Sequence, residues 1–183
     1  MSFRRCFHPI ARRLRYGKRA RLVQRVILFA GLVGILSGAI AWMTHSDVSV
    51  GWLQTAVAHS TSAALNVLGQ ATQVLDGYTV SSSRFSVAVV TACTGLFLTA
   101  LFVSAVLAYP ARWWAKLAGI GIGLGGLFVL NVLRLVCLFL VGVLLPAHVE
   151  VAHLLVLQSL LIVAALFLWL VWVEKVAHGS MAR

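Results

Sequence analysis

Four long apolar runs, separated by short polar stretches, constrain this chain more than any other feature. A helix that crosses a bilayer needs about 20 apolar residues, and four segments approach or exceed that length. They are Val26–Met43, Cys93–Tyr109, Leu117–Leu145 and Val151–Val173. Since 61% of the 183 residues are hydrophobic and 10% are charged, the composition excludes a soluble globular chain. We predict an all-α integral membrane protein with about four transmembrane helices.

The distribution of positive charge predicts the orientation of these helices. The net charge is +11, and nine of the fifteen Lys and Arg residues lie between Arg4 and Arg25, directly before the first apolar run. Between Thr44 and Ala92 only Arg84 is basic. This asymmetry follows the positive-inside rule with both termini cytoplasmic. It favours contact with anionic lipid over binding of nucleic acid.

The chain then divides into five parts. We predict a basic cytoplasmic tail (1–25), a first transmembrane helix (26–43), an extracytoplasmic segment (44–92), a helical core of three transmembrane helices (93–173) and a cytoplasmic tail (174–183). The sequence Ala39-Ile40-Ala41 has the form of a signal-peptidase site. A retained anchor is favoured because the apolar run continues through Trp42 and Met43.

The extracytoplasmic segment shows two patterns. Apolar residues recur at helical spacing over Trp52–Leu75, opposite a polar stripe of Ser62, Asn66, Gln70 and Gln73. This predicts an amphipathic helix at the membrane interface. Tyr78–Val80 and Arg84–Val90 are strand-like and predict a short hairpin.

Five glycines lie in the early part of the third apolar run. No Gly-Lys-Ser/Thr follows them, so they do not form a phosphate-binding loop. Pairs four residues apart, Gly119 with Gly123 and Gly121 with Gly125, favour close approach of a neighbouring helix.

Cys93 stands where a polar approach gives way to the second apolar run. In the first turn of a helix, a thiol is stabilised as thiolate by the helix dipole and by free backbone N–H groups. The amides of Thr94 and Gly95 are then candidate donors to an oxyanion. The competing interpretation is a small buried hydrophobic residue.

Arg134 lies inside an apolar run, where a guanidinium costs at least about 2.5–3.5 kcal/mol to insert. It therefore needs a partner or a role. Asn131, three residues earlier on the same helix face, is placed to orient it. A structural pair with a carbonyl or an acid is the alternative.

His153 opens the last apolar run, and Glu150 lies three residues before it. The pair suggests an imidazole oriented by a carboxylate, although an interfacial histidine is often only solvated. His148 is the competing base. His148 and His153 are five residues apart, which is not a same-face spacing, so no metal site is predicted.

Cys137 is the rival nucleophile, three residues after Arg134. Apolar surroundings in mid-helix keep a thiol unreactive, so Cys93 is preferred. Cys6 lies in the basic tail, so at most one of the three cysteines faces an oxidising compartment. No disulfide framework is expected.

Three short motifs together carry a family resemblance. They are TACTG at Thr91–Gly95, NVLR at Asn131–Arg134 and VAHLL at Val151–Leu155. Their order, spacing and shared membrane side resemble the exosortase/archaeosortase family of membrane transpeptidases. The AHLLVLQ stretch and the short chain are most similar to the small exosortase H-like members. The long members have about eight spans, so this chain departs from them in length.

The resemblance implies a function and a location. It implies that Cys93 is the nucleophile, His153 an acid or base and Arg134 a stabiliser, with no metal or cofactor. Substrates would be exported proteins with a C-terminal sorting tag, cleaved at the periplasmic face of a bacterial inner membrane. The alternatives are a non-catalytic membrane assembly or scaffold protein, and an intramembrane cysteine protease that transfers nothing.

Overall fold

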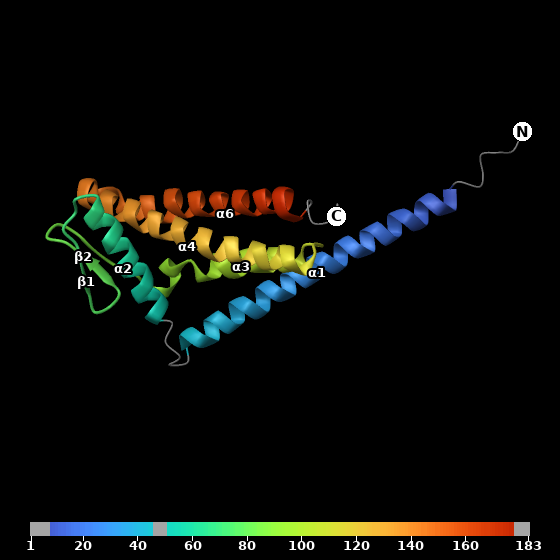
Figure 1. Ribbon diagram of the computed structural model, residues 1–183, viewed down its shortest axis with the longest axis horizontal. Helices are drawn as coiled ribbons and strands as arrows, with labels where there is room; N and C mark the ends of the chain where they lie inside the picture. Colours follow the sequence, from blue (N-terminus) through green and yellow to red (C-terminus); the bar gives the residue numbers. More distant parts are fainter. Residues whose placement is uncertain (1–7, 46–50, 178–183) are drawn as a thin grey trace, which may run out of the picture.

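The protein is a bundle of long helices capped at one end by a short helix and a small sheet (Figure 1). The computed structural model describes residues 8–45 and 51–177. Helix α1 (His8–His45) crosses the bundle diagonally, and α3 (Leu96–Ala108), α4 (Trp113–Leu144) and α6 (Gln158–Trp172) lie along one another (Figure 1). The first described residues and the end of α6 lie toward the same end of the molecule. Cys6, Asp47 and residues 178–183 are outside the described ranges.

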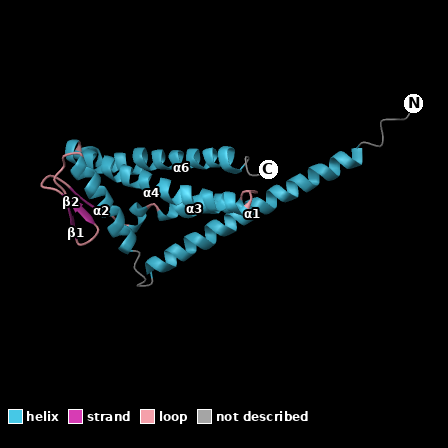
Figure 2. Cartoon of the chain, viewed as in Figure 1, coloured by secondary structure: helices cyan, strands magenta, loops and turns pink. Residues whose placement is uncertain are grey.

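Helices dominate the described chain, and strands are confined to the cap (Figure 2). Three helical segments are long and apolar enough to cross a membrane: Arg19–Thr44, Trp113–Leu144 and Pro146–Val176. The fourth predicted span is a shorter apolar helix, α3, which starts at Leu96 rather than at Cys93. The all-α membrane fold is therefore confirmed, with three long helices and one short one.

The cap consists of α2 (Gly51–Val67) and strands β1 (Gln73–Leu75), β2 (Thr79–Ser81) and β3 (Ser86–Ala88). The predicted hairpin is present, because β2 and β3 pair antiparallel with Val80 opposite Val87. The expected helix to Leu75 is wrong: α2 ends at Val67, and Gln73–Leu75 pairs with β2 instead.

Local hydrogen bonds explain why α2 stops early. Gly69 adopts φ +82°, a left-handed conformation that commonly ends helices. The backbone N–H of Thr72 donates to Asn66 Oδ1 at 2.8 Å, and the hydroxyls of Ser62 and Thr72 are 2.9 Å apart. Ser62 and Asn66, expected to form a water-facing stripe, therefore fold the chain back toward the sheet.

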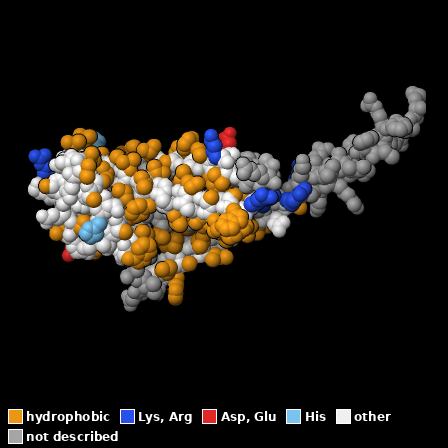
Figure 3. Space-filling view, in the orientation of Figure 1, with side chains coloured by type: hydrophobic (Ala, Val, Ile, Leu, Met, Phe, Trp, Pro, Cys, Tyr) orange, Lys and Arg blue, Asp and Glu red, His pale blue; other side chains and the backbone are white. Residues whose placement is uncertain are grey.

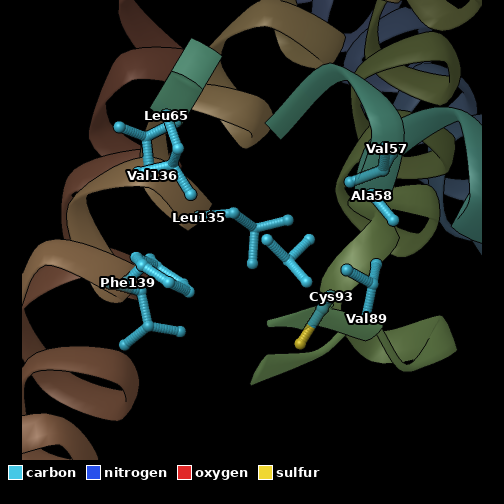
Figure 4. Packing of buried hydrophobic residues seen from close by; sticks show 10 residues of the cluster. Val57, Ala58, Leu65, Val89, Cys93, Leu135, Val136 and Phe139 are labelled. Atoms are coloured by element: carbon cyan, nitrogen blue, oxygen red, sulfur yellow. The ribbon is translucent and has the colours of Figure 1, made fainter. Parts of the chain in front are cut away.

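The described residues form two buried clusters, which follow one another along α4. The cap cluster joins α2 and the sheet to the end of α4; it contains Val57, Leu65, Val80, Leu135 and Phe139 among others (Figure 4). The bundle cluster joins α3, α4 and α6 nearer the other end of α4, and its members are Phe102, Val106, Leu127, Ala165 and Trp172. The segment of α4 around residues 131–134 lies between the two.

The α4 glycines contact neighbouring helices only on one face. A Cβ at Gly119 would lie 2.5 Å from Trp172 Nε1, one at Gly123 would overlap the Phe102 ring, and one at Gly126 would lie 2.9 Å from Leu168. Nothing lies within 4 Å of such a Cβ at Gly121 or Gly125. Close approach is thus confirmed for the first predicted pair and wrong for the second.

Apolar side chains cover much of the flank of the bundle, and Lys and Arg side chains concentrate toward its ends (Figure 3). The exposed apolar residues on α6 include Leu160, Val163, Leu166 and Phe167, all more than half exposed. Such a surface is stable against lipid and costly against water.

Candidate active site

Cys93 lies in a tight turn and not in α3 itself. Thr91–Thr94 forms a 3₁₀ turn, and Gly95 follows with φ +76°, so that α3 begins only at Leu96. The left-handed glycine redirects the chain between the turn and the helix, which is why the expected place of Cys93 in the first helical turn is wrong. The thiol therefore precedes the helix by three residues.

Hydrogen bonds hold this turn from several sides. The Cys93 N–H donates to Val90 O at 2.8 Å, and the Thr94 hydroxyl donates to Thr91 O at 2.7 Å. From α4, Asn131 Nδ2 donates to Cys93 O at 2.7 Å. A Cβ on Gly95 would lie 3.4 Å from Asn131 Cγ, so the glycine also makes room for this amide.

A residue of the cap, Gln54, adds a further contact that the sequence did not single out. Its Nε2 donates to Thr91 Oγ1 at 3.4 Å and so connects α2 with the Cys93 turn. The only signal in the sequence is an amide side chain in the opening turn of α2 beside Leu53. That signal is too weak to identify Gln54 without the fold.

Asn131 and Arg134 occupy one face of α4, as their spacing predicts, and both are buried. Asn131 is 1% exposed and Arg134 is 7% exposed. A terminal nitrogen of the Arg134 guanidinium is 3.4 Å from His153 Nδ1. The Cys93 turn is attached one helical turn earlier on α4, through the bond from Asn131. Arg134 and His153 therefore lie together, and the convergence of the Cys93 sulfur on this pair stays a prediction.

His153 belongs to a π-helical stretch, Ala152–Leu157, at the start of the last long helical segment. Wide turns of this kind occur frequently at functional sites. Arg side chains only donate hydrogen bonds, so the contact with Arg134 requires an unprotonated Nδ1. In this state Nε2 carries the proton of the neutral ring.

The other candidate side chains lie apart from this group. His148 ends a 3₁₀ turn (Pro146–His148), and Glu150 belongs to the short helix α5 (Val149–Val151). Both side chains are exposed, and no bond from Glu150 to His153 is recorded among the described residues. Cys137 is half-buried one turn further along α4. Within the described chain, recorded hydrogen bonds connect His153 to Arg134 and the Cys93 turn to Asn131, and none connects Cys137 or His148 to this group.

Two buried polar atoms of the group have no hydrogen-bond partner within the described chain: Asn131 Oδ1 and Arg134 Nε. Burying such atoms unpaired costs free energy. One is an acceptor and the other a donor, so together they match the N–H and C=O groups of a peptide bond.

The backbone amides of the Cys93 turn are the other candidate donors. A 3₁₀ turn directs its N–H groups to carbonyls three residues back. This favours Arg134 over the Thr94 and Gly95 amides as oxyanion donor.

Cys93 lies at the margin of the cap cluster, with its sulfur at the edge (Figure 4). It is 6% exposed.

Arg134 follows Trp113 by about 32 Å of helix, close to the roughly 30 Å thickness of a bilayer core. The site therefore lies one membrane thickness away from the turn between α3 and α4. The described residues contain no group of three or more metal-binding side chains.

Comparison with known proteins gives a family and no individual relative. No curated protein and no solved structure matches the chain. The family described as "Transmembrane exosortase (Exosortase_EpsH)" matches residues 13–172, which include every residue of the site. The chain therefore belongs to the transmembrane exosortase family.

Proposed function

We propose that this protein is a membrane-embedded cysteine transpeptidase that cleaves a C-terminal sorting tag from exported proteins. The tag would consist of a short motif, a transmembrane helix and a basic cluster, as the family resemblance implies. The observation that carries the proposal is the buried guanidinium of Arg134, which is 3.4 Å from His153 Nδ1. It lies one helical turn from Asn131, whose amide holds the Cys93 turn. A cation held in such a site can stabilise the oxyanion of an acyl-transfer reaction.

In the proposed reaction the thiol proton of Cys93 moves to His153 and the thiolate attacks the scissile carbonyl. The protonated ring donates from both nitrogens, so it must give up its contact with Arg134. The guanidinium is then free to hold the oxyanion. Collapse of the tetrahedral intermediate breaks the C–N bond, His153 protonates the leaving amine, and a thioacyl-enzyme remains.

The second half of the reaction regenerates the thiol. An amine or a glycan-linked nucleophile attacks the thioester and loses its proton to His153. The Cys93 thiolate then leaves and is reprotonated from the ring. If water attacks instead, the same residues act as a protease without transfer.

The proposed setting is the bacterial inner membrane, with the site facing the periplasm and both termini in the cytoplasm. Positive charge supports this orientation. Arg19, Arg21 and Arg25 of α1, and Arg112 and Lys116 around the α3–α4 turn, are all remote from the site. Basic residues of this kind are retained on the cytoplasmic side.

The experiment that tests the function is co-expression with a tagged exported protein, with processing followed by the shift in its mass. We expect Cys93→Ala to abolish processing and Cys137→Ala to leave it unchanged. Normal processing by the Cys93→Ala variant would end the proposed mechanism. Addition of mass from an acceptor, rather than of water, distinguishes transfer from hydrolysis.

A non-catalytic scaffold gives a different pattern. In that case Arg134 would pair with an acid of a partner protein, since a buried cation needs a counter-charge. Cys93→Ser would then have no effect, and Arg134→Ala would dissociate a complex. The attachment of the Cys93 turn to Asn131, one helical turn from Arg134, favours the enzyme.

A further inference from the structure

An apolar cavity of about 590 Å³ lies between α1, α3 and α6, away from the candidate active site. Its walls include Phe29 of α1, Leu101 and Ala105 of α3, and Ile162 and Leu166 of α6. On α3 it extends from Leu98 to Ala108, about 15 Å along the helix axis. Its volume lies within the roughly 300–1,000 Å³ range of small-molecule sites.

One end of this cavity is polar. Arg25, Tyr109 and Trp169 line the cavity at the end of α3 that leads into α4. Trp169 Nε1 is buried and has no acceptor among the described residues. Its neighbour on α6, Trp172, donates its own Nε1–H to Ala115 O at 2.9 Å. The Arg25 guanidinium therefore stands at one end of an otherwise apolar cavity.

Charge at this end of the molecule is strongly positive. Arg112 and Lys116 lie around the adjoining turn, Lys175 follows α6, and Glu174 is the one acidic residue that the structure describes there. Arg25 is exposed, and no acidic partner for it is recorded in the described ranges. A ligand for this cavity must therefore combine a long hydrocarbon with an anionic, acceptor-rich head.

We propose that the cavity binds an anionic phospholipid from the leaflet on the side of the α3–α4 turn. One acyl chain lies between α1, α3 and α6, and the phosphate oxygens accept hydrogen bonds from Arg25. Basic pockets between membrane helices bind anionic head groups in this way. A substrate helix ending in a basic cluster is disfavoured, because its charge would be repelled at the same rim.

The test measures lipid retention by the full-length protein, in native mass spectrometry after exposure to equal amounts of phosphatidylglycerol and phosphatidylcholine. We expect the protein to retain phosphatidylglycerol preferentially. Arg25→Gln should lower that retention about fivefold, the effect of one cationic side chain near the head groups. The matched control is Arg84→Gln, which removes an exposed charge at the opposite end and should change nothing.

A second pair of variants tests the acyl-chain position. Ala105→Leu fills the cavity and should reduce retention of phosphatidylglycerol, whereas Ala118→Leu, on an exposed part of α4, should not. Equal retention of the two lipids by the unchanged protein, or equal effects of Arg25→Gln and Arg84→Gln, overturns the proposal. So does an Ala105→Leu variant that retains lipid but no longer processes substrate, because the cavity would then hold a protein helix. The lipid measurement is independent of catalysis and can be repeated in a Cys93→Ala background.

Discussion

At the scale of single residues, the candidate site depends on Asn131 as much as on the three groups that would react. Its amide is the bond that attaches the Cys93 turn to α4, through Cys93 O at 2.7 Å. Since Arg134 lies one helical turn further on the same face, α4 sets the distance between the sulfur and the guanidinium. Asn131 is therefore a positioning residue.

Replacement of the Asn131 amide should show how much the reaction depends on the position of Cys93. Asn131→Ala leaves the carbonyl of Cys93 buried without a donor, a loss of about 1–3 kcal/mol of stability. A displacement of about 1 Å at a reacting group can cost about 10²-fold in rate, so we expect processing to fall by that order in protein that still folds. The processing rate measures catalysis, thermal unfolding measures stability, and the rate of Cys93 alkylation measures displacement of the thiol.

The matched control is Asn66→Ala, which removes an amide from the cap that bonds Thr72 and not the Cys93 turn. It should lower stability by a similar amount and leave processing largely intact. If both variants lose activity in proportion to stability, Asn131 has only a structural role.

At the scale of elements, the left-handed glycine after the 3₁₀ turn determines where the thiol lies. Gly95→Ala should cost roughly 1–2 kcal/mol of stability, because L-residues are strained in this conformation. It should also displace Asn131, since the new Cβ would lie 3.4 Å from Asn131 Cγ. We expect processing to fall well beyond the loss of folded protein.

Gly69→Ala is the control for backbone strain. Gly69 has φ +82° and nothing within 4 Å of an added Cβ, so the variant carries the strain without the contact. Thermal unfolding and processing, measured on both variants, separate the effect of backbone strain from the effect of the contact with Asn131. Equal losses of processing would remove Gly95 from the site.

The glycines of α4 give a second comparison between elements. Gly123→Ala would press a methyl group into the Phe102 ring of α3 and should destabilise the bundle by about 1–3 kcal/mol. Gly121→Ala faces open space and should be neutral or stabilising by up to about 1 kcal/mol, through helix propensity. Thermal unfolding in detergent measures both. A Gly121→Ala variant that is the less stable of the two would contradict the observed packing.

The elements also show how far sequence reasoning reaches. Apolar runs predicted the long helices because burial in lipid needs only length and composition. The cost of an arginine in an apolar helix identified Arg134, and its spacing to Asn131 placed both on one face. The 3₁₀ turn, the left-handed Gly95 and the Gln54 contact were not predictable, because each depends on how α2 and α4 meet the turn. The β1 strand was read as helix because its partner β2 determines its conformation.

At the scale of the whole molecule, the lengths of α3 and α4 differ, and that difference explains where the site lies. α4 is about 48 Å long and exceeds the bilayer core, whereas α3 is about 20 Å long and does not cross it. The Cys93 turn, the end of α4 and the cap fill the remaining depth. Cys93 therefore lies at the cap end of the bundle.

This arrangement predicts opposite exposure for the two ends of the bundle. Single cysteines are introduced at Arg84 in the cap and at Lys175 after α6, in a chain whose Cys6, Cys93 and Cys137 are replaced by serine. A membrane-impermeant maleimide should label Arg84→Cys in intact spheroplasts and label Lys175→Cys only after permeabilisation, because basic ends are retained in the cytoplasm. Labelling of Lys175→Cys in intact spheroplasts, with Arg84→Cys protected, would show that the site faces the cytoplasm. Exported proteins could then not reach Cys93 after export, and the proposed sorting function would fail while the lipid site on the α3–α4 side could still stand.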